Sequence, residues 1–371
     1  MKGFTLVEFL VVALILGLLA LGVFTALPRL KKNSDLNSAA QVAASLLIEA
    51  RARTLSSEGA SRFGVHFEPN TITLFTGSVF NPSDASNRAV ALPISVEVSC
   101  ISLGGGASSA VFARLTGETA QYGFVNFRLR SETDAIRTVA VTEAGTIFID
   151  EGRQGLIGYW DFNDGSGSVA GDRGVGGNDG ALTNMNTSSA WVSGKMCGAL
   201  DFDGANDYVR VLGDALDVAD DMTISLWVKP SVSSSGFHSS WNYFIWHKDP
   251  NQSETTKYEL GYYDTNGPRF KPYNQTGTDF DFSANLFFAA DTWYHVVYRR
   301  LGTLLEIYVD GALVDSRNDF SGNLRLTGSD GEVRIGGQGG SSGFIGTIDE
   351  VRMYNRALDT SEIRRLYTVG I

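Results

Sequence analysis

The chain has 371 residues, of which 43% are hydrophobic and 19% charged, and this composition is typical of a folded protein and not of a disordered one. Its formal net charge is −11, which argues against a general nucleic-acid binder, because such a protein needs a basic surface to neutralise phosphates. Glycine is abundant (42 residues) and proline scarce (8 residues), which indicates many tight turns between short strands.

The only two cysteines, Cys100 and Cys197, are far apart and lie in parts of the sequence that differ in character. Their number and spacing match neither a disulfide framework nor a zinc site. We therefore expect each of them to be a small, buried, apolar side chain.

Residues 4–27 form an apolar run that is long enough to cross a bilayer as a helix, and one carboxylate, Glu8, interrupts it. An ionised side chain inside a membrane costs about 2.5–3.5 kcal/mol unless it finds a partner. A cleaved secretory signal ending near residues 20–22 is one alternative, although its apolar core would be too long. A plain membrane anchor is another, but it leaves Glu8 unexplained.

The beginning of the chain, Lys2-Gly3 followed by Phe4-Thr-Leu-Val-Glu8, resembles the prepilin signal of type IV pilins and type II secretion pseudopilins. The resemblance implies that a prepilin peptidase removes residues 1–3, cutting between Gly3 and Phe4, and methylates the new terminus. It also implies that Glu8 of one subunit pairs with the Phe4 amine of another pilin subunit, which makes a buried charge tolerable. The implied location is the inner (cytoplasmic) membrane before assembly, then an extracellular pilus or a periplasmic pseudopilus.

Helical spacing of apolar residues continues beyond the membrane run, so one long helix is expected over residues 4–58, kinked at Pro28. Residues 59–150 change to short alternating segments, which predict a small antiparallel sheet packed on the second half of that helix. Gly64-Val-His-Phe67 and Arg137-Thr-Val-Ala-Val141 resemble GspH/FimT-type pseudopilins. Some members of that family capture DNA, a role that the acidity of this segment disfavours.

Residues 151–155 resemble a linker, and residues 156–371 then carry β-rich segments at fairly regular spacing with no helical pattern between them. Many strands without helices predict a β-sandwich. Gly158-Tyr-Trp-Asp-Phe162, Thr223-Ile-Ser-Leu-Trp-Val-Lys229 and Gly346-Thr-Ile-Asp-Glu-Val-Arg-Met-Tyr-Asn-Arg-Ala-Leu358 resemble the laminin-G-like, concanavalin A-like jelly-roll family. The expected fold class is thus an α+β pilin followed by an all-β jelly-roll sandwich.

No catalytic constellation is expected in the chain. Retaining glycosidases need two carboxylates about 5–5.5 Å apart, flanking the scissile bond. The nearest candidate, Asp349-Glu350, is a pair of sequence neighbours, which a regular strand places on opposite faces. We therefore expect a protein that is not an enzyme.

The jelly-roll resemblance implies a structural calcium ion held between early loops and the last strand, where several oxygen ligands can gather. The candidate ligands are Asp172, Asp203, Asp207 and Asp349. The alternative is that these aspartates form turns, which need no metal.

Sugar binding would use aromatic rings that pack against the apolar face of a pyranose. Four candidates lie in the Ser- and Asn-rich stretches 231–255 and 264–285, which we expect to be exposed: Trp241, Tyr243, Trp246 and Tyr273. Packing is the alternative role for each of them. Trp227 and Trp293, in contrast, are expected in the core.

These features predict a minor or tip pilin subunit that displays a laminin-G-like module, which would bind carbohydrate or an extracellular matrix protein. One alternative is a membrane-tethered enzyme or accessory module acting on polysaccharide. A second alternative is a minor pilin that captures DNA, which the net charge disfavours.

Overall fold

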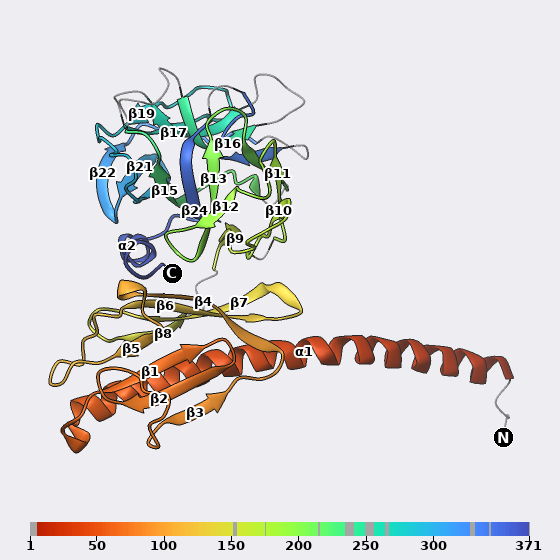
Figure 1. The fold of residues 1–371 in the computed structure, drawn as a ribbon. Helices are drawn as coiled ribbons and strands as arrows, with labels where there is room; N and C mark the ends of the chain where they lie inside the picture. Colours follow the sequence, from red (N-terminus) through yellow and green to blue (C-terminus); the bar gives the residue numbers. More distant parts are fainter. Residues whose placement is uncertain are drawn as a thin grey trace.

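A computed structural model describes residues 6–150, 154–174, 176–213, 216–233, 241–248, 256–263, 267–326, 331–340 and 343–370. Within these ranges the side chains of residues 6–30, 132–135, 150 and 241 are not described. The chain forms a long helix, an α+β part wrapped around its second half, and a separate β-sandwich (Figure 1).

Helix α1 spans Leu6–Leu55, and its first part extends away from the rest of the chain (Figure 1). The helix continues through Pro28, so the predicted kink is not evident, and the turns on either side carry it past one missing backbone donor. Where the structure describes side chains, no helix is long and apolar enough to span a membrane. The predicted span and Glu8 lie in the segment whose side chains are not described, and Gly3 and Phe4 lie outside the described residues altogether.

The second half of α1 packs against two four-stranded antiparallel sheets, where the sequence predicted a single small sheet. The orders are β3-β2-β1-β5 and β4-β6-β7-β8. The strands are β1 Phe63–Glu68, β2 Thr71–Thr76, β3 Arg88–Ala91, β4 Val96–Leu103, β5 Ser109–Val111, β6 Gly123–Leu129, β7 Glu132–Val141 and β8 Ile147–Asp150, with 3-10 turns at Glu58–Ala60 and Gly104–Gly106. One helix stripe, spaced by three and four residues, is buried in the shared core: Leu36, Ala39, Ala40, Ala43, Leu47 and Ala50.

The β-sandwich begins at residue 156 and consists of two sheets with one large apolar core between them. The first, here called the β16 sheet, has the order β10-β11-β14-β23-β16-β17-β18-β19. The second, the β24 sheet, has the order β12-β13-β24-β15-β20-β21-β22, and β9 pairs with β24. The strands are β9 Leu156–Trp160, β10 Val169–Ala170, β11 Gly180–Thr183, β12 Trp191–Ser193, β13 Gly198–Asp203, β14 Tyr208–Leu212, β15 Met222–Pro230, β16 Trp241–Lys248, β17 Thr256–Tyr263, β18 Pro268–Pro272, β19 Phe282–Ser283, β20 Tyr294–Leu301, β21 Leu304–Val309, β22 Ala312–Arg317, β23 Glu332–Ile335 and β24 Ile345–Tyr354.

A second helix, α2 at Thr360–Val369, contradicts the expectation of a sandwich without helices. Its start is a capping box: the Asp359 side chain accepts from the Glu362 backbone N–H, and the Glu362 side chain accepts from the Asp359 backbone N–H. Ile363 and Leu366 of α2 pack on apolar side chains of the β24 sheet. Helix α2 therefore covers part of the outer face of that sheet.

A disulfide joins Cys100 to Cys197, so the prediction of two separate buried thiols is wrong. Cys100 lies in β4 of the helix-bound part, and Cys197 directly precedes β13 of the sandwich. Their Cα atoms are 6.1 Å apart, within the range that a disulfide requires, although 97 positions separate them in sequence. Only the docking of the two parts against each other brings these cysteines together.

Candidate functional site

The outer face of the β16 sheet carries a row of aromatic and charged residues. Antiparallel register aligns Trp246 with Arg334 on one side and with Glu259 on the other, and Glu259 with Lys271. Residues aligned in this way share a face of the sheet. The row therefore crosses four neighbouring strands, β23, β16, β17 and β18.

The structure gathers three of the four predicted sugar-binding residues around Glu259. The rings of Tyr243 and Trp246 are 6.1 Å apart between centroids, and the Tyr273 hydroxyl donates to Glu259 Oε1 at 3.3 Å. Trp246 and Tyr273 are partly exposed, whereas Tyr243 is only 6% exposed and serves mainly to pack against the others. The side chain of Trp241 lies outside the described part of the chain.

These aromatic residues lie on or beside strands. Trp246 belongs to β16, which runs through the Ser- and Asn-rich stretch 231–255 that was expected to be exposed. Its indole N–H is buried, and no described residue accepts from it. A ligand can therefore reach only the exposed part of the Trp246 side chain and not this donor.

Cations surround the rings of this face. Lys248 Nζ lies 4.6 Å from the Trp246 ring centroid, and Lys271 Nζ lies 5.2 Å from that of Tyr273. Burial raises the pKa of Glu259 above its ordinary value, against the opposing charge of Lys271. The face thus offers ring surfaces, hydrogen-bond donors and one partly desolvated carboxyl group.

The charged residues of the row were not predicted from the sequence. Glu259 and Lys271 are ordinary surface residue types, and their alignment with Trp246 depends on strand pairing between segments that are distant in sequence. The available signal was the period-two pattern of β17, in which Tyr258, Leu260 and Tyr262 face the core. That pattern places Glu259 on the outer face.

The four predicted calcium ligands do not form one site. Asp172 accepts hydrogen bonds from the backbone N–H groups of Tyr159, Gly174 and Asn178, and Asp207 accepts from the Asp203 backbone N–H. Asp349, also buried, instead accepts from the Met196 backbone N–H. Among the described residues, no group of three or more His, Cys, Asp or Glu side chains is placed to hold a metal ion.

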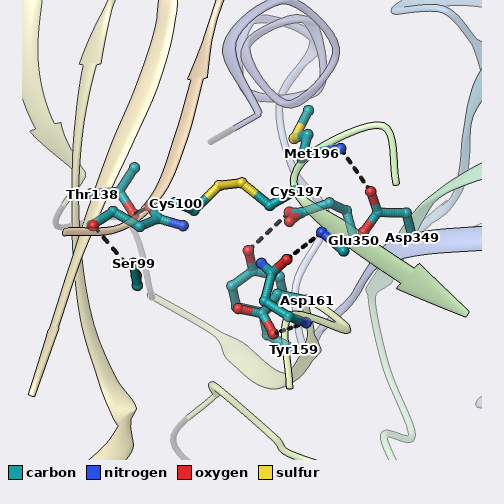
Figure 2. Close-up of a disulfide and its surroundings, with 12 residues drawn as sticks. Ser99, Cys100, Thr138, Tyr159, Asp161, Met196, Cys197, Asp349 and Glu350 are labelled. Carbon is teal, nitrogen blue, oxygen red and sulfur yellow. Dashed lines mark hydrogen bonds between the residues drawn. A yellow bond between two sulfur atoms is a disulfide. The ribbon is translucent and has the colours of Figure 1, made fainter. Parts of the chain in front are cut away.

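Asp349 and Glu350 are both buried on the outer side of the β24 sheet, so the expectation of opposite faces is wrong (Figure 2). A β-bulge is the reason: β24 has one more residue than β15 between the Trp227–Asp349 and Ser225–Arg352 pairs. Glu350 takes the left-handed conformation there, with φ at 55°. Both carboxyl groups lie beside the disulfide, where burial raises the pKa of each.

Trp227 is buried as expected, but it faces away from the sandwich core. It packs with Phe124, Met196 and Val369 in a cluster between the two folded parts, and Trp293 is partly buried against the same cluster. The next residue but one, Lys229, faces Trp293 with its ammonium group 5.4 Å from the ring centroid.

Residues 203–364 match the family described as the concanavalin A-like lectin/glucanases superfamily, under the name Laminin_G_3. Residues 203–364 form a concanavalin A-like jelly-roll domain. The match includes the whole row from Arg334 to Lys271 and the β24 bulge. No curated protein matches the chain.

Several solved structures are similar to the jelly-roll part. Domain 4 of the GH43 extracellular arabinanase AbnA from Geobacillus stearothermophilus, solved with arabinotriose, is 20% identical, with a TM-score of 0.45 over 57% of this chain and 98% of that one. The binding domain of Paraclostridial Mosquitocidal Protein 1 is 16% identical, with a TM-score of 0.42 over 58% and 52%. The botulinum neurotoxin serotype D domain solved with N-acetylneuraminic acid is 12% identical, with a TM-score of 0.40 over 58% and 51%. These TM-scores are too low to carry an argument about function.

Proposed function

We propose that this chain is a subunit of a type IV pilus or type II secretion-like pseudopilus, and that its jelly-roll domain binds carbohydrate as a minor or tip adhesin. The observation that carries the binding role is the row of Trp246, Glu259 and Lys271 on the outer face of a lectin-type sandwich. In this proposal the chain is a binding protein and not an enzyme. The nearest carboxyl pair, Asp349 and Glu350, is buried under the disulfide, out of reach of a polysaccharide.

A sugar ring would pack on the exposed part of the Trp246 indole, where CH groups of the pyranose cover an aromatic face. Glu259 would accept hydrogen bonds from sugar hydroxyls, and Lys271 would donate to sugar oxygens. A binding site of this kind needs few polar groups, provided that each is held in place. Tyr273 holds Glu259 through its hydroxyl, at 3.3 Å.

The assembly role is supported by the prepilin-type beginning of the chain and by the shape of α1. Cleavage after Gly3 would leave Phe4 as the amino terminus and Glu8 near it, ready to pair with a neighbouring subunit. The first part of α1 extends away from the folded domains, and two sheets cover its second half (Figure 1). The proposed partners are a prepilin peptidase and other pilin subunits.

The disulfide supports a location outside the cytoplasm for both folded parts. Structural disulfides persist in oxidising compartments and are rare in the cytosol. Cys100 and Cys197 belong to different parts, so both parts would share that compartment. This agrees with the proposed passage from the inner membrane to an extracellular filament.

The binding role is tested by screening the full chain in detergent against a glycan array, and then measuring the affinity for any glycan that binds. Trp246→Ala should weaken binding about tenfold, because loss of packing on the aromatic ring costs about 1.4 kcal/mol. Phe287→Ala is the matched control, because Phe287 is an aromatic residue that is 60% exposed elsewhere on the sandwich. Equal loss in both variants, or no bound glycan at all, would contradict the proposal.

Melting temperatures of the chain with added calcium and with a chelator test the calcium ion that was expected from the sequence. Calcium should raise the melting temperature of the chain if it is bound by Asp172, Asp203, Asp207 or Asp349. An unchanged melting temperature would leave these aspartates with hydrogen-bonding roles alone.

The assembly role is tested in filament-forming cells. Gly3→Ala should block removal of the leader, and Glu8→Ala should block incorporation into filaments, because the subunit contact loses its charge pair. Glu68→Ala is the control, since this carboxylate is exposed at the end of β1. Normal filaments that carry the Glu8 variant would refute the role.

A further inference from the structure

The interface between the helix-bound part and the sandwich has an apolar part and a covalent part, the disulfide. Its apolar part is one cluster in which Phe124 of β6 meets Met196, Trp227 and Val369 of the sandwich. Domains of one chain normally move relative to each other unless their interface is large and hydrophobic. The Cys100–Cys197 disulfide adds a covalent tie between these two parts.

We propose that this disulfide is a mechanical bypass: tension between α1 and the jelly-roll domain crosses from Cys100 to Cys197 and leaves residues 101–196 unloaded. The source of tension rests on the proposed function, because a filament subunit that holds a surface glycan is pulled at both ends. The bypass itself depends only on the covalent connectivity of the folded chain.

The covalent path explains why these residues are unloaded. The anchored end, α1, precedes Cys100 in sequence, and the row around Trp246 follows Cys197. The disulfide closes a loop over 97 positions, which holds β5 to β12 and the connection at residues 151–155. A covalent bridge across the ends of a loop carries the tension that the loop would otherwise carry.

The strands at the two possible points of entry differ in strength. Without the bridge, tension would reach the helix-bound part through β8, an edge strand that pairs with β7 at four positions, Thr138–Asp150 to Val141–Ile147. A force on the end of an edge strand breaks its hydrogen bonds one after another. With the bridge, tension enters at Cys100, inside β4, which is the opposite edge strand of the same sheet but pairs with β6 at seven positions.

The sandwich side shows the same difference. Without the bridge, tension would enter through β9, whose partner among the described strands is β24. With the bridge it enters beside β13, which has a paired strand on each side, β12 and β24. The bridge therefore moves the load to strands that are better held, and protects β6, β7 and β8, whose side chains form the core around α1.

The test is single-molecule force spectroscopy on the full chain in detergent, with non-cysteine handles at Asn33 and Gln275, which are exposed residues on either side of the bridge. The oxidised chain should release a contour length shorter by about 320–350 Å than the reduced chain, since 97 residue steps stay hidden. The reduced chain should also show a first unfolding event at lower force, as β8 is peeled away. Cys197 is exposed, so a reductant can reach the bridge in the folded chain.

The Cys100→Ser/Cys197→Ser variant is the matched control and should behave like the reduced chain with or without reductant. If that variant does not fold, the reduced wild-type chain still provides the comparison. Equal contour lengths before and after reduction would overturn the proposal, and so would a first event in the reduced chain at equal or higher force. Neither outcome involves glycan or filament, so failure of the bypass is distinguishable from failure of the proposed function.

Discussion

The two outer faces of the jelly-roll domain carry similar residues under different conditions. The β16 sheet presents Trp246 in a row with Glu259 and Lys271, and the β24 sheet presents Trp227 beside Asp349, with Lys195 over its ring. Trp246 is partly exposed, whereas Trp227 is only 2% exposed because α2 and the helix-bound part cover it. An outward-facing tryptophan with charged neighbours is thus a binding surface or a packing surface, depending on what lies above it.

Helix α2 and the helix-bound part, together called the cover of the β24 sheet, also change the pKa values of the groups beneath them. Burial lowers the pKa of His295 to about 3, and the nearby charges of Arg352 and Lys195 contribute in the same direction. His295 is held by Ser225, with 2.8 Å between its Nε2 and the hydroxyl oxygen. On the open face, burial raises the pKa of Glu259, while the charge of Lys271 and the hydrogen bond from Tyr273 act to lower it. Titration can therefore report whether the cover is in place.

The largest expected effect comes from removing the covalent support of the cover. The Cys100→Ser/Cys197→Ser variant should lose about 4 kcal/mol of unfolding free energy, because a disulfide that closes a long loop strongly restricts the unfolded chain. Guanidinium unfolding followed by tryptophan fluorescence measures it. A loss below about 1 kcal/mol would mean that the two parts unfold independently of the bridge.

The next effect compares the two tryptophans directly. Trp227→Ala should lower the unfolding free energy by about 3 kcal/mol, because it leaves a cavity under the cover. Trp246→Ala should lower it by less than about 1 kcal/mol and should affect glycan binding instead. Urea unfolding of both variants checks this. Equal losses in both would show that the two faces do not differ in the way described.

A pH effect of about 2 kcal/mol should follow from His295. Its pKa in the folded state, about 3, lies below the ordinary value of 6.5, so between these values the unfolded chain binds a proton that the folded chain does not. The contribution of this group is therefore present above pH 6.5 and is lost as the pH falls, by about 2 kcal/mol from pH 7 to pH 5. His295→Gln should flatten this dependence. The raised pKa values of Asp349 and Glu350 change the stability in the opposite direction with pH, in variant and wild type alike. An equal dependence of the unfolding free energy on pH in variant and wild type would contradict the assignment to His295.

The smallest effect concerns the cap of the covering helix. Asp359→Ala should cost about 1 kcal/mol, because the backbone N–H of Glu362 loses its acceptor. Amide hydrogen exchange in α2 should become faster while that in the β16 sheet stays unchanged. Faster exchange on both sheets would mean that α2 supports the whole sandwich and not one face of it.

Much of the fold was predictable because it depends on local periodicity. The short alternating segments of residues 59–150 predicted antiparallel strands, which the structure shows as β1 to β8, and the β-rich segments of residues 156–371 predicted the sandwich. Helix α2 was not predicted, although Asp359 and Glu362 have the spacing of a capping box, which is a local sign of a helix start. β16 was missed because Ser- and Asn-rich flanks outweighed its aromatic residues.

The site was only partly predictable. The aromatic residues Tyr243, Trp246 and Tyr273 were recognised by type, but Glu259 and Lys271 became members through strand register alone. The relation of Asp349 to Glu350 was predicted wrongly, because regular alternation ignores a bulge that is set by the pairing with β15. Pairing partners distant in sequence leave no local trace in either segment.

By itself, the sequence determined the jelly-roll fold of residues 203–364, the long helix at the start of the chain, and the residue types available on each strand, since hydrophobic period and turn residues act locally. The tertiary structure alone decided that Cys100 meets Cys197, that Trp227 is covered and Trp246 is not, and that a carboxylate lies beside Trp246. These outcomes depend on how two folded parts dock and how strands pair, and the energies that settle them come from surfaces that no single segment contains.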